Sequence, residues 1–169
     1  MFTDEIKEKA NEIRKRYSLN SIPVDLNKVT SKEKIAVTEM DFTEHEEKVN
    51  MQISGILYIN GNTKKIFVNE RDNLRRKNFT VAHELGHYFL HYDGSKKDEV
   101  FVSFRGDSNP RETEANKFAA ELLIPTEELK KVHEATLYPT LTYLADRFDV
   151  STQAMSIQLN REGLSFIGI

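Results

Sequence analysis

Apolar residues return every three or four positions along several segments of the chain, which is the spacing of one face of an α-helix. Asp4–Tyr17 is the first such segment, with charged residues between the apolar ones. Others begin near Pro110 and Thr126, and the tail from Thr140 onward is helical with one break. The spacing therefore predicts a protein with several amphipathic helices.

Strand-like alternation appears between the predicted helices, in Lys34–Phe42, Ile53–Ile59, Lys65–Asn69 and Glu99–Phe104. Asn60-Gly61-Asn62 separates the second segment from the third and indicates a tight hairpin, because Asn and Gly tolerate positive φ. The charged run Glu44–Lys48 is expected to be a solvated loop. These patterns predict an α+β fold with a small, mainly antiparallel sheet packed on helices.

Composition narrows the class of protein. The chain has 169 residues, enough for one domain or for a small domain with an appendage, with 38% hydrophobic and 30% charged residues. A net charge of −3 gives no reason to expect broad nucleic-acid binding. There is no cysteine, so His, Asp or Glu must hold any metal. No apolar run approaches membrane-spanning length, so we expect no membrane partner and a cytoplasmic protein.

The segment Phe79–His91 carries the residues with the clearest chemistry. Within it His83 and His87 are four residues apart, so on a helix they share a face and can bind one metal ion. Glu84 is about 100° round the helix from His83, which allows it to line the same wall of a cleft. This pattern is typical of a metal-dependent peptidase, with His83 and His87 as ligands and Glu84 as general base.

Two further residues of this predicted helix need an explanation. Gly86 lowers helix stability by about 1 kcal/mol relative to alanine, so we expect another backbone, or the substrate, to approach closely there. His91 shares the face of His83, but about 12 Å along the helix axis places it beyond the same ion. We therefore expect His91 to support a metal ligand or to pack, rather than to act in catalysis.

A catalytic zinc site needs a third protein ligand and leaves one position for water. The helix that begins at Pro110 carries two candidates, Glu112 and Glu114. Glu112 shares its face with alanines that permit close packing, and Asn116, one turn away, can accept the spare N–H of a ligating histidine. We favour Glu112 as the third Zn²⁺ ligand and keep Glu114 as the alternative.

The run Phe79–His91, followed by Glu112–Pro125, resembles the ImmA/IrrE family of bacterial zinc metallopeptidases. The resemblance continues in Ile22-Pro23-Val24-Asp25 and in Leu144–Ser151, so it covers nearly the whole chain. It implies a gluzincin with a compact, thermolysin-like zincin core, in which a glutamate of a Glu-x-x-x-Asp/Asn pattern joins the His-Glu-x-x-His helix. Glu112 and Asn116 match that pattern.

The resemblance also implies a function, because members of this family usually cleave a DNA-binding repressor. The expected activity is that of a zinc-dependent endopeptidase acting on a helix-turn-helix repressor of a prophage, mobile element or stress regulon, encoded nearby. We expect a zincin-like metallopeptidase domain over residues 1–135 and a helical extension packed on it over residues 136–169. The substrate peptide is expected to lie along Ile53–Ile59 as an edge strand.

Residues 140–161 provide the alternative interpretation, because they resemble a helix-turn-helix. A DNA- or repressor-binding regulatory protein with a structural zinc and little proteolysis would use them for recognition. However, the second helix of this segment carries only Arg161 as a positive charge, which is sparse for phosphate contacts. Direct nucleic-acid binding is therefore not expected, and the oligomeric state is left open.

Overall fold

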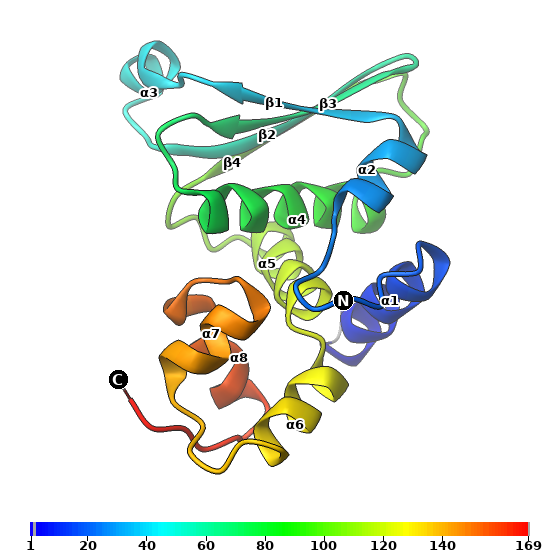
Figure 1. Cartoon of the computed structure of the whole chain (residues 1–169). Coiled ribbons are helices and arrows are strands. Elements are labelled where there is room, and N and C mark those ends of the chain that lie inside the picture. Colours follow the sequence, from blue (N-terminus) through cyan, green and yellow to red (C-terminus); the bar gives the residue numbers. More distant parts are fainter. Residues whose placement is uncertain (2, 169) are drawn as a thin grey trace.

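The computed structural model describes residue 1 and residues 3–168; residue 2 of the predicted peptidase domain and residue 169 of the predicted extension lie outside it. A four-stranded sheet lies on α4, and α1 and α5–α8 lie on the side of α4 away from the sheet (Figure 1). In chain order the elements are α1 (Thr3–Arg16), α2 (Asn27–Glu33), β1 (Ile35–Met40), α3 (Thr43–Val49), β2 (Ile53–Asn60), β3 (Thr63–Asn69), α4 (Leu74–Leu90), β4 (Asp98–Phe104), α5 (Pro110–Leu123), α6 (Thr126–Glu134), α7 (Leu141–Phe148) and α8 (Thr152–Arg161).

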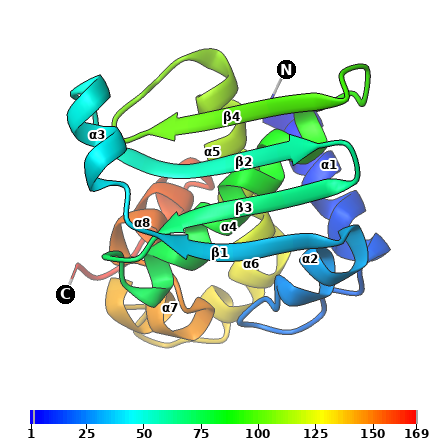
Figure 2. The same ribbon diagram turned by 90° about the horizontal axis from the view of Figure 1, so that it is seen from above.

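The sheet is mixed, with the strand order β1-β3-β2-β4 (Figure 2). β1 pairs with β3 in parallel, whereas β2 pairs with β3 and with β4 in antiparallel fashion, so the mainly antiparallel sheet is confirmed. The predicted hairpin joins β2 to β3, and Gly61 in its turn has a φ of 57°. The prediction that Ile53–Ile59 forms an edge strand is wrong, because β4 pairs with the other side of β2. The edges are β1 and β4.

The charged run Glu44–Lys48 lies in helix α3, so the predicted loop is also wrong. No residue of α3 is buried, and polar contacts hold the helix instead. Lys48 Nζ lies 2.7 Å from Glu44 Oε1, one turn away, and Asp41 Oδ1 accepts a hydrogen bond from the Thr43 amide. Charge pairs at this spacing stabilise a short helix even when it has no apolar face.

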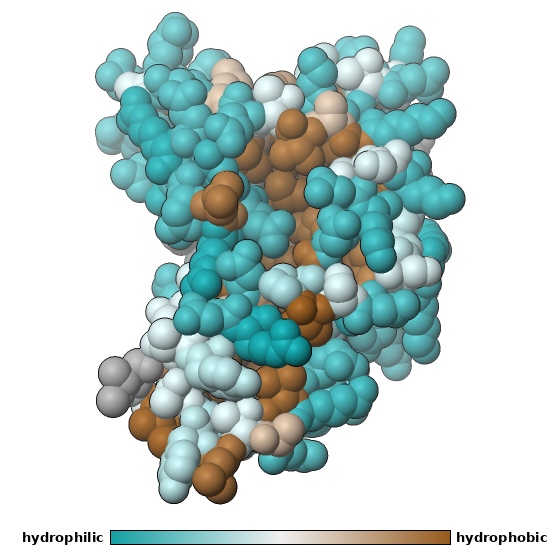
Figure 3. All heavy atoms as spheres, viewed as in Figure 1, coloured by the Kyte–Doolittle hydropathy of each residue, from teal (hydrophilic) through white to brown (hydrophobic). Residues whose placement is uncertain are grey.

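The hydrophobic core lies between the inner face of the sheet and α4, and continues beneath α4 among α1, α5 and α6. In Figure 3 hydrophilic residues cover much of the surface, and apolar residues show between the sheet and α4. The core cluster also includes side chains of α7 and α8, such as Phe148 and Leu159, so the C-terminal segment packs on the rest of the chain. The domain boundary at residue 135, the thermolysin-like character of the core and the helix-turn-helix character of residues 140–161 stay predictions.

A buried polar contact also fixes the place of α8. Glu121 of α5 accepts hydrogen bonds from Gln158 Nε2 at 3.0 Å, from the Thr126 amide at 3.0 Å and from the Thr126 hydroxyl at 2.8 Å. These bonds tie α8 and the start of α6 to the end of α5. Within the described part of the chain, no helix is both long enough and apolar enough to cross a membrane.

Candidate metal centre

Helix α4 holds the first part of the centre. Asn73 caps the helix by accepting a hydrogen bond from the Arg76 amide at 2.9 Å, and every residue from 80 to 87 is buried. Because His83 and His87 lie one turn apart, their Nε2 atoms approach to 3.2 Å. The helix therefore directs two imidazole nitrogens at one point, as the spacing in the sequence predicts.

Helix α5 brings a carboxylate to the same point. Asn109 caps this helix, with Pro110 at its first position, and accepts from the Glu112 amide at 3.1 Å. The Glu112 oxygens lie 3.0 Å from His83 Nε2 and 3.0 Å from His87 Nε2. One ligand atom from each of the three residues falls within 4.8 Å of the others. Among the described residues this is the one such group of potential metal ligands.

Glycine permits the two helices to approach each other this closely. A Cβ atom added to Gly86 would lie 3.0 Å from Ala115 Cα and 3.1 Å from the Ala115 carbonyl oxygen. The expected close approach of another backbone is thus confirmed, and the partner is α5. A larger residue at position 86 would push α5 away from α4. Glu112 of α5 would then move away from His83 and His87 of α4, because this contact sets the separation of the two helices.

Glu114 lies outside this group and contacts it only indirectly. Its Oε2 is 2.9 Å from His91 Nε2, and His91 Nδ1 is 2.9 Å from His87 Nδ1. Its other oxygen pairs with the amino group of Met1 at 2.5 Å. The structure therefore places Glu112, rather than Glu114, beside the two imidazoles, and gives His91 the supporting contact that we expected.

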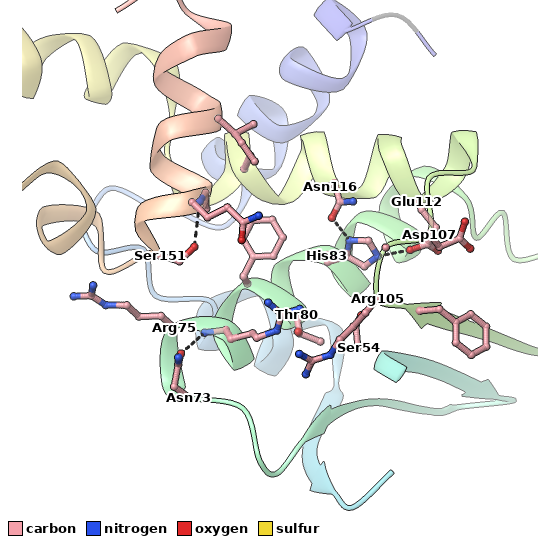
Figure 4. A pocket seen from close by; sticks show the side chains of 18 of the residues that line it. Ser54, Asn73, Arg75, Thr80, His83, Arg105, Asp107, Glu112, Asn116 and Ser151 are labelled. Carbon is pink, nitrogen blue, oxygen red and sulfur yellow. Dashed lines mark hydrogen bonds and ion pairs between the residues drawn. The ribbon is translucent and has the colours of Figure 1, made fainter. Parts of the chain in front are cut away.

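Asn116 makes the contact that the sequence suggested. Its Oδ1 lies 2.9 Å from His83 Nδ1 and accepts a hydrogen bond from that nitrogen, so Nε2 is the ring nitrogen that faces the centre (Figure 4). Burial by itself raises the pKa of Glu112, but hydrogen bonds with His83 and His87 outweigh it and lower that pKa to about 2. The third candidate ligand is thus a carboxylate rather than a carboxylic acid at neutral pH, as metal binding requires.

Glu84 is fully buried, and neither of its carboxylate oxygens has a hydrogen-bond partner among the described residues. Burial raises the pKa of this group, because it disfavours the charged form. A buried polar group without a partner is destabilising and needs an explanation. A water molecule and a metal ion held by the neighbouring group would supply that partner. The residues present therefore fit a metal such as zinc, which binds imidazole and carboxylate ligands.

Two residues near the centre were missed in the sequence. Ser103 of β4 is buried, with its Oγ 3.2 Å from His83 Nε2 and 3.4 Å from His87 Nε2. Its signal was a polar residue at a core-facing position of an alternating strand. Gly55 of β2 lies against Glu84: an added Cβ would be 2.8 Å from Glu84 Oε1. No local pattern marks Gly55, because its neighbour comes from a different element.

A cavity of about 440 Å³ opens beside the centre. His83, Glu112 and Asn116 line it at one end, and residues from the start of α4, the end of β4 and one face of α8 line the rest (Figure 4). This volume suits several residues of an extended peptide.

Comparison with known proteins decides the family. The model of the IrrE N-terminal-like domain, a metallopeptidase family, matches residues 30–160, which include all the residues of the centre. The chain belongs to the ImmA/IrrE family. Metallopeptidase ImmA of Bacillus subtilis (strain 168) is 33% identical to it over 87 residues, which are 52% of this chain and 49% of that protein. The match thus spans about half the length of that relative.

Family membership confirms the resemblance drawn from the sequence. It also gives a reason for the buried histidine and glutamate group, because the family and the relative are both named as metallopeptidases.

Proposed function

We propose that the chain is a zinc-dependent endopeptidase in which His83, His87 and Glu112 hold the ion and Glu84 moves the proton. The observation that carries the proposal is the buried, unpartnered carboxylate of Glu84 beside a group of three potential ligands. A structural zinc site is normally closed by four protein ligands, whereas a catalytic one has three and leaves room for water. The described group has three members and opens on a cavity, which favours the catalytic kind.

When bound, zinc polarises the scissile carbonyl and lowers the pKa of water. Glu84 accepts a proton from the attacking water and passes it to the leaving amine. In the metal-free chain burial raises the pKa of Glu84, whereas a cation held beside it would favour the charged carboxylate that accepts the proton. Asn116 fixes the orientation of the His83 ring, and His91 does the same for His87.

Edge strand β4 replaces β2 as the expected path of the substrate. Its last residue, Phe104, and the adjoining Arg105 line the cavity, and its buried Ser103 lies beside the imidazoles. An extended peptide can add to the free side of β4 through backbone hydrogen bonds, which hold it without requiring a particular sequence.

The proposed substrate is a helix-turn-helix repressor of a prophage, mobile element or stress regulon, encoded near the gene, by analogy with the family. The alternative, a DNA- or repressor-binding regulator with a structural zinc, has weaker support. One face of α8 lines the cavity, including Gln153 and Ile157, and Arg161 remains the one cationic residue of that helix. Cytoplasmic localisation stays a prediction.

The test is the substitution Glu84→Gln in the zinc-loaded chain. We expect about one zinc ion per chain to be retained, and cleavage of the nearest encoded helix-turn-helix repressor to fall by roughly 100-fold or more. Glu44→Gln, on the exposed helix α3, serves as the matched control and should change neither property. Unchanged cleavage by the Glu84→Gln protein would refute the assignment, and salt-dependent binding to duplex DNA would favour the alternative.

A further inference from the structure

The cavity extends well beyond the residues that hydrolysis requires, and its far part is rich in arginine. Four arginines line it: Arg75, Arg76, Arg105 and Arg161. A positively charged wall in a cleft that would also hold a metal ion attracts anionic groups. Which of these charges is available to a ligand depends on how far carboxylates of the chain itself neutralise them.

The guanidinium group of Arg75 is already paired with carboxylates of the chain itself. Its Nε lies 2.8 Å from Asp149 Oδ1 and its Nη2 lies 2.8 Å from Asp146 Oδ1, while Nη1 donates to the Val150 carbonyl at 3.3 Å. Two carboxylates thus surround one guanidinium. Arg75 ties the start of α4 to the turn between α7 and α8, and it offers no excess charge to a ligand.

Arg76 and Arg105 have the opposite charge balance to Arg75, because these two guanidinium groups share a single carboxylate. Arg105 Nη2 lies 2.5 Å from Asp72 Oδ1, and Arg76 Nε lies 3.5 Å from Asp72 Oδ2. Asp72 is the one carboxylate paired with either of them among the described residues. The Asp72 side chain is 8% exposed, whereas those of Arg76 and Arg105 are 45% and 30% exposed. One positive charge therefore remains, and it faces the cavity rather than the core.

Among the described residues, no acidic group across the cavity forms an ion pair with Arg76 or Arg105. Asp107 and Glu112 also line it, and in Figure 4 the Arg105 side chain extends toward Thr80, on the other side from these two carboxylates. Glu112 is engaged by the histidines, and Asp107 accepts hydrogen bonds from Asn109.

We propose that Arg76 and Arg105 form a subsite for an acidic side chain of the substrate peptide, on the side of the scissile bond that faces the start of α4. This inference rests on the proposed peptidase function. A carboxylate placed there forms charge-assisted hydrogen bonds with donors that Asp72 leaves free. Phe79, Ala154 and Ile157 line the cavity with apolar surface, so the side chain next to the acidic one is expected to be apolar.

Peptide hydroxamates test the subsite without depending on turnover, because the hydroxamate binds the metal directly. Two sets of peptides are needed. Peptides that end in a hydroxamate extend to one side of the ion, and peptides that follow a succinyl hydroxamate extend to the other side. In each set an aspartate and an asparagine version are compared at the three positions nearest the hydroxamate. At one position the aspartate version should bind the zinc-loaded chain about tenfold more tightly, and the difference should shrink as salt is added.

Variants connect this preference to the two arginines. Arg105→Gln should reduce the aspartate preference to less than about threefold while leaving the affinity for the asparagine peptide unchanged. Arg76→Gln should also reduce the aspartate preference. Because this variant keeps the Arg105–Asp72 pair, it replaces Arg105→Gln as the test if that variant folds poorly. Arg71→Gln is the matched control, because Arg71 pairs with Asp41 and does not line the cavity.

The outcomes separate this subsite from the proposed function. Equal binding of the aspartate and asparagine peptides at every position, or a preference that survives in both variants, overturns the subsite and leaves the peptidase assignment standing. Failure of every hydroxamate to bind the zinc-loaded chain contradicts the metal centre, and the subsite with it.

Discussion

Gly55→Ala is a sharp test of how the structure positions Glu84, since it adds one methyl group next to the proposed base. The new Cβ would lie 2.5 Å from Thr80 Cγ2 and 2.8 Å from Glu84 Oε1. Ordinary contact begins at 3.4 Å, so the methyl group is about 0.9 Å too close to Thr80 and about 0.6 Å too close to Glu84. Both neighbours belong to buried turns of α4, and the Phe67 carbonyl oxygen is 3.3 Å away on another side, so little free space remains.

The expected effect has two parts. Overpacking of this size typically lowers the free energy of unfolding by about 1–3 kcal/mol, and each kcal/mol lowers Tm by roughly 2–4 °C in a chain of this length. Displacement of a catalytic group by about 1 Å reduces turnover by on the order of 100-fold, so a shift of about half that size should reduce cleavage by roughly tenfold or more. Zinc content should remain close to that of the unaltered protein, because the three atoms nearest to the added Cβ belong to Thr80, Glu84 and Phe67 and not to the proposed ligands.

Thr80→Ser separates the two contacts, because it removes Cγ2 and keeps the hydroxyl group. In the double variant the clash with Thr80 is gone, whereas the contact with Glu84 Oε1 remains. The double variant should therefore regain much of the lost Tm but little of the lost cleavage. The assays are thermal melting, zinc content and cleavage of the repressor. A Gly55→Ala protein that melts and cleaves like the unaltered chain refutes the packing argument, and full recovery of cleavage in the double variant refutes the role of the Glu84 contact.

Two further predictions concern the third ligand and the dependence on pH. Glu112→Gln should weaken zinc binding by 100-fold or more. Glu114→Gln should weaken it by no more than about tenfold, because Glu114 reaches His87 only through His91. Competition with a zinc chelator measures both effects, and a stronger effect of Glu114→Gln would reverse the ligand assignment. In the metal-free protein the folded-state pKa of Glu112 is about 2, below its ordinary value of 4.5, so its stabilising contribution is present above pH 4.5 and is lost as the pH falls toward 2. Urea unfolding across that range should show the loss in the unaltered chain and a smaller one in Glu112→Gln, and equal slopes for the two proteins would contradict the low pKa.

Local spacing was sufficient to identify the elements that carry the candidate site residues. A spacing of four residues places His83 and His87 on one helical face whatever surrounds them, and an Asn-Gly turn joins β2 to β3 because few other dipeptides accept its backbone angles. Caps such as Asn109 likewise act within one helical turn. These features depend on residues that are close in the sequence, so they can be predicted from it.

The tertiary structure decided the features that depend on distant residues. The contact between Gly86 and Ala115 sets how α5 lies on α4, and this contact brings Glu112 rather than Glu114 to the imidazoles. The pairing of β4 with β2 makes β2 an interior strand, and it also places Ser103 beside the histidines. Helix periodicity shows which side chains share a face, but only the packing of elements shows which faces meet. For that reason the sequence by itself determined that His83, Glu84 and His87 lie together on one helix. The fold decided that Glu112 joins the two histidines and that β4 is the edge strand along which a substrate can lie.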